Sequence, residues 1–142
     1  MDKEFIPYEQ SLELKGLGFN EPCFGFYVNG ELRGVNLGLE EMGGVEPYYQ
    51  RFGFHTLHNS DITNTTKIIV TTPTFSQSFR WFREKYGYNG VIEGSNRFGF
   101  EWCIYRNEFE YIKPPNNTPD YEESELQCLL KLIDIVKQTI NS

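Results

Sequence analysis

The sequence predicts an α+β protein of two layers, in which three helices cover an antiparallel sheet of about five strands. Two segments, near residues 23–37 and 91–105, alternate like β-hairpins, and two, near residues 75–86 and 119–139, have the spacing of amphipathic helices. The chain contains 16% aromatic residues and no alanine, which favours sheet surfaces. Its 142 residues fit a single domain, residues 1–142, with a long loop or insertion at about 38–67.

The first predicted element is a short helix from Pro7 to Leu17. Proline is tolerated at the first position of a helix, and Gly18 can take the left-handed conformation that ends one. In a Schellman ending of this kind, Phe19 folds back onto Leu14.

A β-hairpin follows at residues 23–37. Large apolar residues alternate along its first strand, and Asn29-Gly30 is the dipeptide best suited to the positive φ angles of a type I′ turn. The second strand is therefore expected near Glu31 to Leu37.

Residues 38–67 show no sustained helical or strand period, although they contain both histidines. A structureless loop of this length is uncommon inside a domain. Three interpretations remain open: a functional insertion, a partly ordered excursion with a strand around Tyr48 to Leu57, and a tolerated loop.

The clearest helix signal begins after a predicted buried strand at residues 68–70. Thr74 and Gln77 have the spacing of a capping box, and the helix is predicted from Phe75 to Tyr86. At 100° per residue Trp81 falls roughly 120° from the aromatic stripe, so we expect it to be exposed or to make only secondary contacts. The stripe itself, which we expect to face the core, consists of Phe75, Phe79, Phe82 and Tyr86.

The last two elements are a second hairpin and a long helix. The segment Val91 to Glu93 turns through residues 94–96 into an alternating strand, and Thr118-Pro119-Asp120 predicts the start of a helix that runs to Thr139. The side chains of the second strand that we expect to face the core are Phe98, Phe100, Trp102 and Ile104.

Composition excludes several classes of function. The formal charge of −7 disfavours general binding to nucleic acid, which is itself an anion. No leader-like N-terminus and no apolar run near the length of a membrane span are present, so we expect a cytoplasmic protein that does not enter a membrane. Dinucleotide and phosphate-loop fingerprints are missing, so we expect no cofactor.

Residues 72–87 and 121–137 form two specific blocks of sequence, to which residues 5–8 and 17–23 can be added. These blocks resemble a family of small uncharacterised proteins from Bacteroides-type bacteria and their phages. Together they cover about two fifths of the chain. The resemblance implies a bacterial or phage origin, but it implies no activity and no functional residue, and the loop at 38–67 lies outside it.

His55, His58 and Asp61 form the nearest approach to a metal or acid–base cluster. Their spacing would place them on one face of a helix, but the local sequence is not helix-like, so ordinary loop histidines are the preferred interpretation. The alternative is a small hydrolase or transferase that uses both histidines with Asp61 or Glu101.

The three cysteines suggest no catalytic nucleophile. Cys103, on an alternating strand, and Cys128, on the last helix, are expected to be buried, whereas Cys23 at a strand edge is expected to be more exposed. They are odd in number and widely spaced, which signals neither a disulfide framework nor a zinc site. No catalytic residue is assigned.

Two sets of residues are candidates for binding. Tyr and Arg are enriched in protein interfaces, and the long loop contains Tyr48, Tyr49, Arg51 and Phe52. The middle helix contains Arg80, Trp81 and Arg83, which could hold single-stranded nucleic acid or form a solvated basic face beside the acidic last helix. The preferred function is a non-enzymatic protein that binds another protein; a nucleic-acid accessory role is a further alternative, and self-association is left open.

Overall fold

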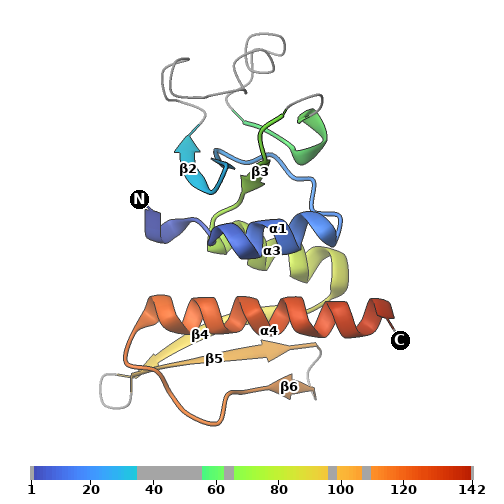
Figure 1. The fold of residues 1–142 in the computed structure, drawn as a ribbon. Coiled ribbons are helices and arrows are strands. Elements are labelled where there is room, and N and C mark those ends of the chain that lie inside the picture. Colours follow the sequence, from blue (N-terminus) through green and yellow to red (C-terminus); the bar gives the residue numbers. More distant parts are fainter. Residues whose placement is uncertain (1, 35–55, 63–65, 96–98, 107–109, 142) are drawn as a thin grey trace. The chain divides into compact units, whose positions relative to one another are not determined.

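The described strands form two three-stranded antiparallel sheets, one in each of two units of the chain. The computed structural model describes residues 2–34, 56–62, 66–95, 99–106 and 110–141 (Figure 1). Its contacts group the chain into Met1–Thr74 and Phe75–Ser142. The α+β class is confirmed, but the single sheet of about five strands is not, because each hairpin pairs with a third strand of its own. That residues 1–142 form a single domain stays a prediction.

Helix α1 spans Tyr8–Gly16 and ends as the sequence predicts. Gly18 has a φ of 94°. The backbone N–H groups of Gly18 and Phe19 donate to the carbonyl oxygens of Lys15 and Leu14 at 3.0 and 2.9 Å. These are the two hydrogen bonds of a Schellman motif. Both Leu14 and Phe19 are buried, so this ending anchors α1 in the core of the N-terminal unit.

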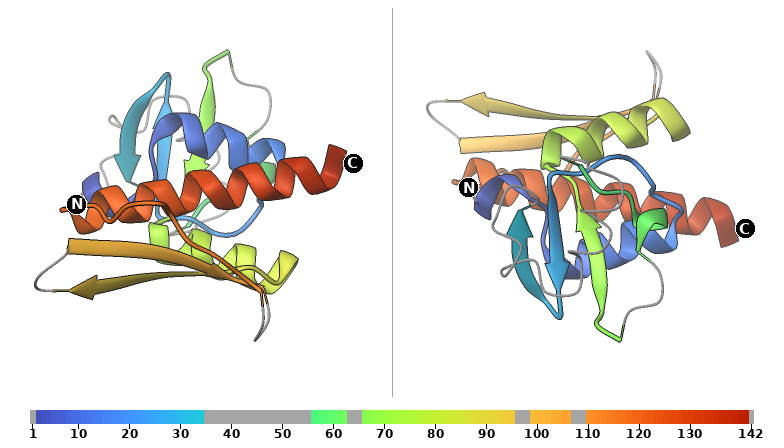
Figure 2. Two further views of the ribbon diagram at one scale, coloured as in Figure 1. Left: turned by 90° about the horizontal axis from the view of Figure 1, so that it is seen from below. Right: turned by 90° about the horizontal axis from the view of Figure 1, so that it is seen from above.

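Strands β1 (Gly25–Val28) and β2 (Glu31–Gly34) form the first predicted hairpin. The φ angles of Asn29 (49°) and Gly30 (86°) are positive, as a type I′ turn requires. On its other side β1 pairs with β3 (Ile69–Thr72), so β1 is the central strand of this sheet (Figure 2). All four residues of β1 are buried. Residues 35–37, the predicted end of the second strand, lie outside the described residues.

A short 3₁₀ helix, η3 (Asn59–Asp61), lies within the predicted loop. Just before it, Leu57 pairs with Cys23 through two backbone hydrogen bonds of 2.8 and 2.9 Å. This bridge fixes the end of the loop to the segment that leads into β1. The predicted strand around Tyr48 to Leu57 lies outside the described residues, apart from its last two.

The C-terminal unit contains α3 (Phe75–Tyr86), β4 (Asn89–Ser95), β5 (Gly99–Tyr105) and α4 (Tyr121–Asn141), close to the predicted ranges. Strands β4 and β5 pair along their whole length. Strand β6 (Tyr111–Ile112) adds a third strand that the sequence does not signal, because two residues are too few to show an alternating pattern.

Helix α4 packs along one face of the sheet β4–β5–β6 (Figure 1). Trp102 and Ile104 are buried on this face, as predicted, and Trp102 Nε1 donates a hydrogen bond to Gln127 Oε1 of α4 at 3.3 Å. Gly90, the partner of Ile104 in the register, lies against Cys128 of α4. None of the helices that the structure describes is both long enough and apolar enough to cross a membrane.

Candidate functional site

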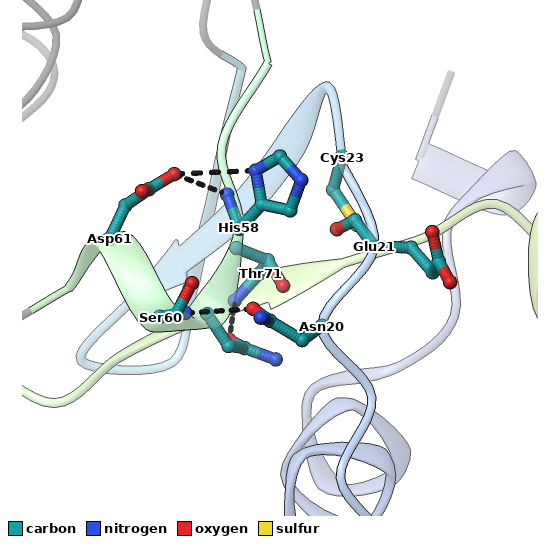
Figure 3. Close-up of polar contacts among 8 residues, drawn as sticks. Asn20, Glu21, Cys23, His58, Ser60, Asp61 and Thr71 are labelled. Carbon is teal, nitrogen blue, oxygen red and sulfur yellow. Dashed lines mark hydrogen bonds and ion pairs between the residues drawn. The ribbon is translucent and has the colours of Figure 1, made fainter.

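His58 and Asp61 frame the η3 turn in the N-terminal unit (Figure 3). Asp61 Oδ2 accepts a hydrogen bond from the His58 backbone N–H at 2.9 Å and lies 3.4 Å from His58 Nδ1. Asp61 therefore closes the turn, and its contact with the imidazole becomes an ion pair only when the ring is protonated. His55, the third member of the predicted cluster, lies outside the described residues.

Asn59 joins this turn to the rest of the N-terminal unit. It is buried, its Nδ2 donates to the Phe19 carbonyl oxygen at 3.0 Å, and its Oδ1 accepts from the Thr71 backbone N–H at 2.9 Å. Nearby, the Ser60 N–H donates to Asn20 Oδ1 at 2.9 Å (Figure 3). The turn thus has a structural role, in which Asn59 supplies hydrogen bonds to two backbone groups far apart in the sequence.

Cys23 was expected to be more exposed than the other cysteines, and this prediction is wrong. Its backbone bridge to Leu57 places it inside the unit, where it is fully buried. Its thiol donates to the Glu21 carbonyl oxygen at 3.5 Å, and burial raises its pKa to about 12. Burial therefore favours the neutral thiol of Cys23, which is the opposite of the environment that activates a cysteine nucleophile.

The other thiols are equally unsuited to nucleophilic attack. Cys103 and Cys128 are buried, as predicted, and burial raises the pKa of Cys128 to about 12. Glu101, the alternative carboxylate of the hydrolase hypothesis, lies 3.5 Å from Lys113 Nζ in the C-terminal unit. Within the described residues, no three His, Cys, Asp or Glu side chains gather as a metal site would require.

Trp81 was expected to be exposed or to make only secondary contacts, and the structure shows that it is buried. Only 6% of it is exposed, and its ring packs edge-on against Phe82 and Tyr86 at centroid distances of 5.0 and 5.5 Å. The buried face of α3 includes Ser78, which is fully buried and lies three residues before Trp81. A stripe drawn through the aromatic residues alone leaves out Ser78, and the buried face of α3 therefore extends further toward Trp81 than that stripe predicts.

Of the remaining predicted binding residues, the structure describes only those of α3. Arg80 and Arg83 are exposed on α3, but the buried Trp81 cannot offer its face to a nucleic-acid base. The four residues of the long loop lie outside the described residues: Tyr48, Tyr49, Arg51 and Phe52.

A pocket that the sequence analysis missed lies in the C-terminal unit. It has a volume of about 330 Å³. Its lining residues come from the start of β4, the end of β5, the start of β6 and the C-terminal half of α4. The lining combines three isoleucines and two tyrosines with one ion pair: Ile104, Ile112, Ile135, Tyr88, Tyr111, Arg106 and Glu110.

Comparison of the chain with protein-family models, with curated proteins and with solved structures finds no match. The pocket therefore has to be interpreted from its own chemistry.

The walls of the pocket are apolar and its rim is charged. Ile104 is buried, whereas 60% of Tyr111 and 37% of Ile112 remain exposed. Arg106 Nη1 lies 3.9 Å from Glu110 Oε2, and both side chains are largely exposed. A cavity of this kind can take up an apolar group while the rim contacts a polar or charged neighbour.

Proposed function

We propose that this chain is a non-enzymatic cytoplasmic protein, of bacterial or phage origin, that binds another protein. In this proposal the pocket of the C-terminal unit receives an apolar side chain of the partner. The observation that carries it is the combination of an apolar cavity with tyrosine and arginine at its rim, because interface hot spots are rich in these residues and cluster around filled pockets.

The size and exposure of the pocket support this proposal over a cofactor site. Pockets for drug-sized ligands measure roughly 300–1,000 Å³. A volume of about 330 Å³ lies at the low end of that range and suits one large side chain better than a dinucleotide. Ile112 lines the cavity and is 37% exposed, so part of its apolar side chain can contact a partner.

The experiment is affinity capture from a bacterial lysate with the tagged full chain and two matched variants. Tyr88→Ser removes a ring at the pocket, whereas Tyr121→Ser removes an exposed ring at the start of α4, far along the helix from Ile135. We expect Tyr88→Ser to reduce capture of a specific protein by about tenfold or more, as loss of an interface hot spot does. We expect Tyr121→Ser to capture it normally. Equal capture by both variants, or no specific protein with the unmodified chain, would contradict the proposal.

A further inference from the structure

Arg106 is held in a defined position at the rim of the pocket. Its backbone N–H donates to the Glu110 carbonyl oxygen at 3.0 Å, which fixes the residue at the start of the connection between β5 and β6. Its guanidinium carbon lies 5.8 Å from the centroid of the Tyr88 ring. This distance allows a cation–π contact that orients the planar guanidinium beside the cavity.

The guanidinium of Arg106 has N–H donors that are available to a ligand. A guanidinium has five N–H donors and requires acceptors within about 3.2 Å. Its partner Glu110 lies at 3.9 Å, too far for a hydrogen bond, and no other described residue accepts one from this side chain. An exposed ion pair at this distance contributes little to stability, so a better-placed carboxylate can replace Glu110.

The apolar cavity and the available guanidinium together define the chemistry of the ligand. It must carry an apolar group that fills a space bounded by Ile104, Ile112 and Ile135, and an acceptor a few bonds away that reaches Arg106. The C-terminal residue of a polypeptide has both groups on one Cα atom: its side chain and its free carboxylate. Bidentate pairing with a carboxylate is the geometry that arginine favours.

Resting on the function proposed above, we infer that the pocket recognises the C-terminal residue of a partner protein, with an apolar last side chain in the cavity and the terminal carboxylate on Arg106. The preceding residues of the partner extend past the ring of Tyr88, which lies beside Arg106. A free small acid lacks this additional contact.

The test uses the full chain on an array of peptides whose last three positions are varied, each synthesised with a free C-terminal carboxylate and with a C-terminal amide. We expect binding to peptides that end in a large apolar residue, and a loss of about tenfold or more on amidation, as expected when a charge-assisted pair is removed. Arg106→Gln should cause the same loss. Arg83→Gln, which removes an exposed arginine of α3, should not. Ile135→Phe, which fills the cavity, should weaken binding without removing the carboxylate dependence.

Three results would overturn the inference: binding that survives amidation, binding unaffected by Arg106→Gln, or competition by hexanoate at the concentration at which the peptide itself competes. The last would indicate a site for small acids. If a lysate protein is captured in a Tyr88-dependent manner but amidation has no effect, the protein-binding function stands and only the terminal-carboxylate inference fails.

Discussion

The side-chain oxygen of Asn59 accepts a hydrogen bond from the backbone N–H of Thr71 at 2.9 Å, joining the η3 turn to strand β3. The amide nitrogen of the same side chain donates to the Phe19 carbonyl oxygen at 3.0 Å, beyond the end of α1. One buried side chain therefore connects three segments. Its removal would take the acceptor from the buried Thr71 N–H and one donor from the Phe19 carbonyl oxygen, and each unsatisfied buried group costs about 1–3 kcal/mol.

Asn59→Ala is therefore expected to lower the free energy of unfolding by about 2 kcal/mol or more. Asn20→Ala is the matched control, because Asn20 accepts a hydrogen bond from the Ser60 N–H at an exposed position where water replaces it. We expect this control to lose less than about 1 kcal/mol. Urea denaturation of both variants measures the difference. Equal losses of unfolding free energy would show that the buried Asn59 hydrogen bonds stabilise the protein no more than the exposed one of Asn20.

The second prediction concerns the buried face of α3. Since Trp81 is buried and Phe79 only partly so, Trp81→Ala should cost about 3–5 kcal/mol. Phe79→Ala should cost about 1–2 kcal/mol, because part of its ring is already in water. This order is the reverse of the one that the aromatic stripe predicts. Denaturant midpoints at unchanged m-value decide it, and a larger loss for Phe79 would restore the original assignment of the core face.

Elements with strong local signals were predictable from the sequence. The type I′ turn at Asn29-Gly30 and the Schellman ending at Gly18 are set by residues that tolerate positive φ, so the chain itself encodes them. The sheet arrangement was not predictable in the same way. Pairing of β1 with β3 joins segments some forty residues apart. No local sequence pattern predicts whether two hairpins form one sheet or two.

The candidate site was harder to predict than the fold. The pocket is lined by residues from β5, β6, α4 and the connections between them, so it exists only after these elements pack. Arg106 and Tyr88 are eighteen positions apart in the sequence and meet because β4 and β5 are antiparallel partners. Short-range spacing in the sequence indicates only local clusters such as His58 and Asp61, and these two residues serve to close a turn.

The third prediction concerns the close contact between β4 and α4. A Cβ atom added to Gly90 would lie 2.9 Å from Cys128 Sγ and 3.2 Å from Leu132 Cδ1. Gly90→Ala should therefore destabilise the protein by about 1–3 kcal/mol through overpacking. Gly16→Ala, at the end of α1 with open space around it, should be neutral or slightly stabilising. Adding Cys128→Ala to Gly90→Ala should recover part of the loss, and an additive double variant would contradict the contact.

The fourth prediction follows from the buried thiol of Cys23, whose pKa rises from 9.0 to about 12 on burial. Between these values the folded state holds a proton that the unfolded state has lost, so stability falls as pH rises. The contribution of the protonated Cys23 thiol to the free energy of unfolding is fully present below about pH 9. Above that pH it decreases by at most about 1.4 kcal/mol per pH unit. Urea denaturation between pH 8 and 11 should show a steeper decline for the unmodified chain than for Cys23→Ala. Parallel declines would mean that Cys23 ionises normally in the folded protein.

The fifth prediction addresses the long loop, whose aromatic residues lie outside the described part of the chain. Some thirty residues without periodicity become ordered only if their rings find partners, either on the protein's own sheets or on another chain. If the partner is another chain, replacing Tyr48, Tyr49 and Phe52 by serine should change the melting temperature by no more than a degree or two and abolish association. If the rings belong to the core, the same change should lower stability by several kcal/mol through lost apolar burial. A thermal melt paired with a size-exclusion profile separates these outcomes. A large loss of stability with unchanged association would exclude the loop as an interaction surface and leave the pocket at Arg106 as the remaining candidate.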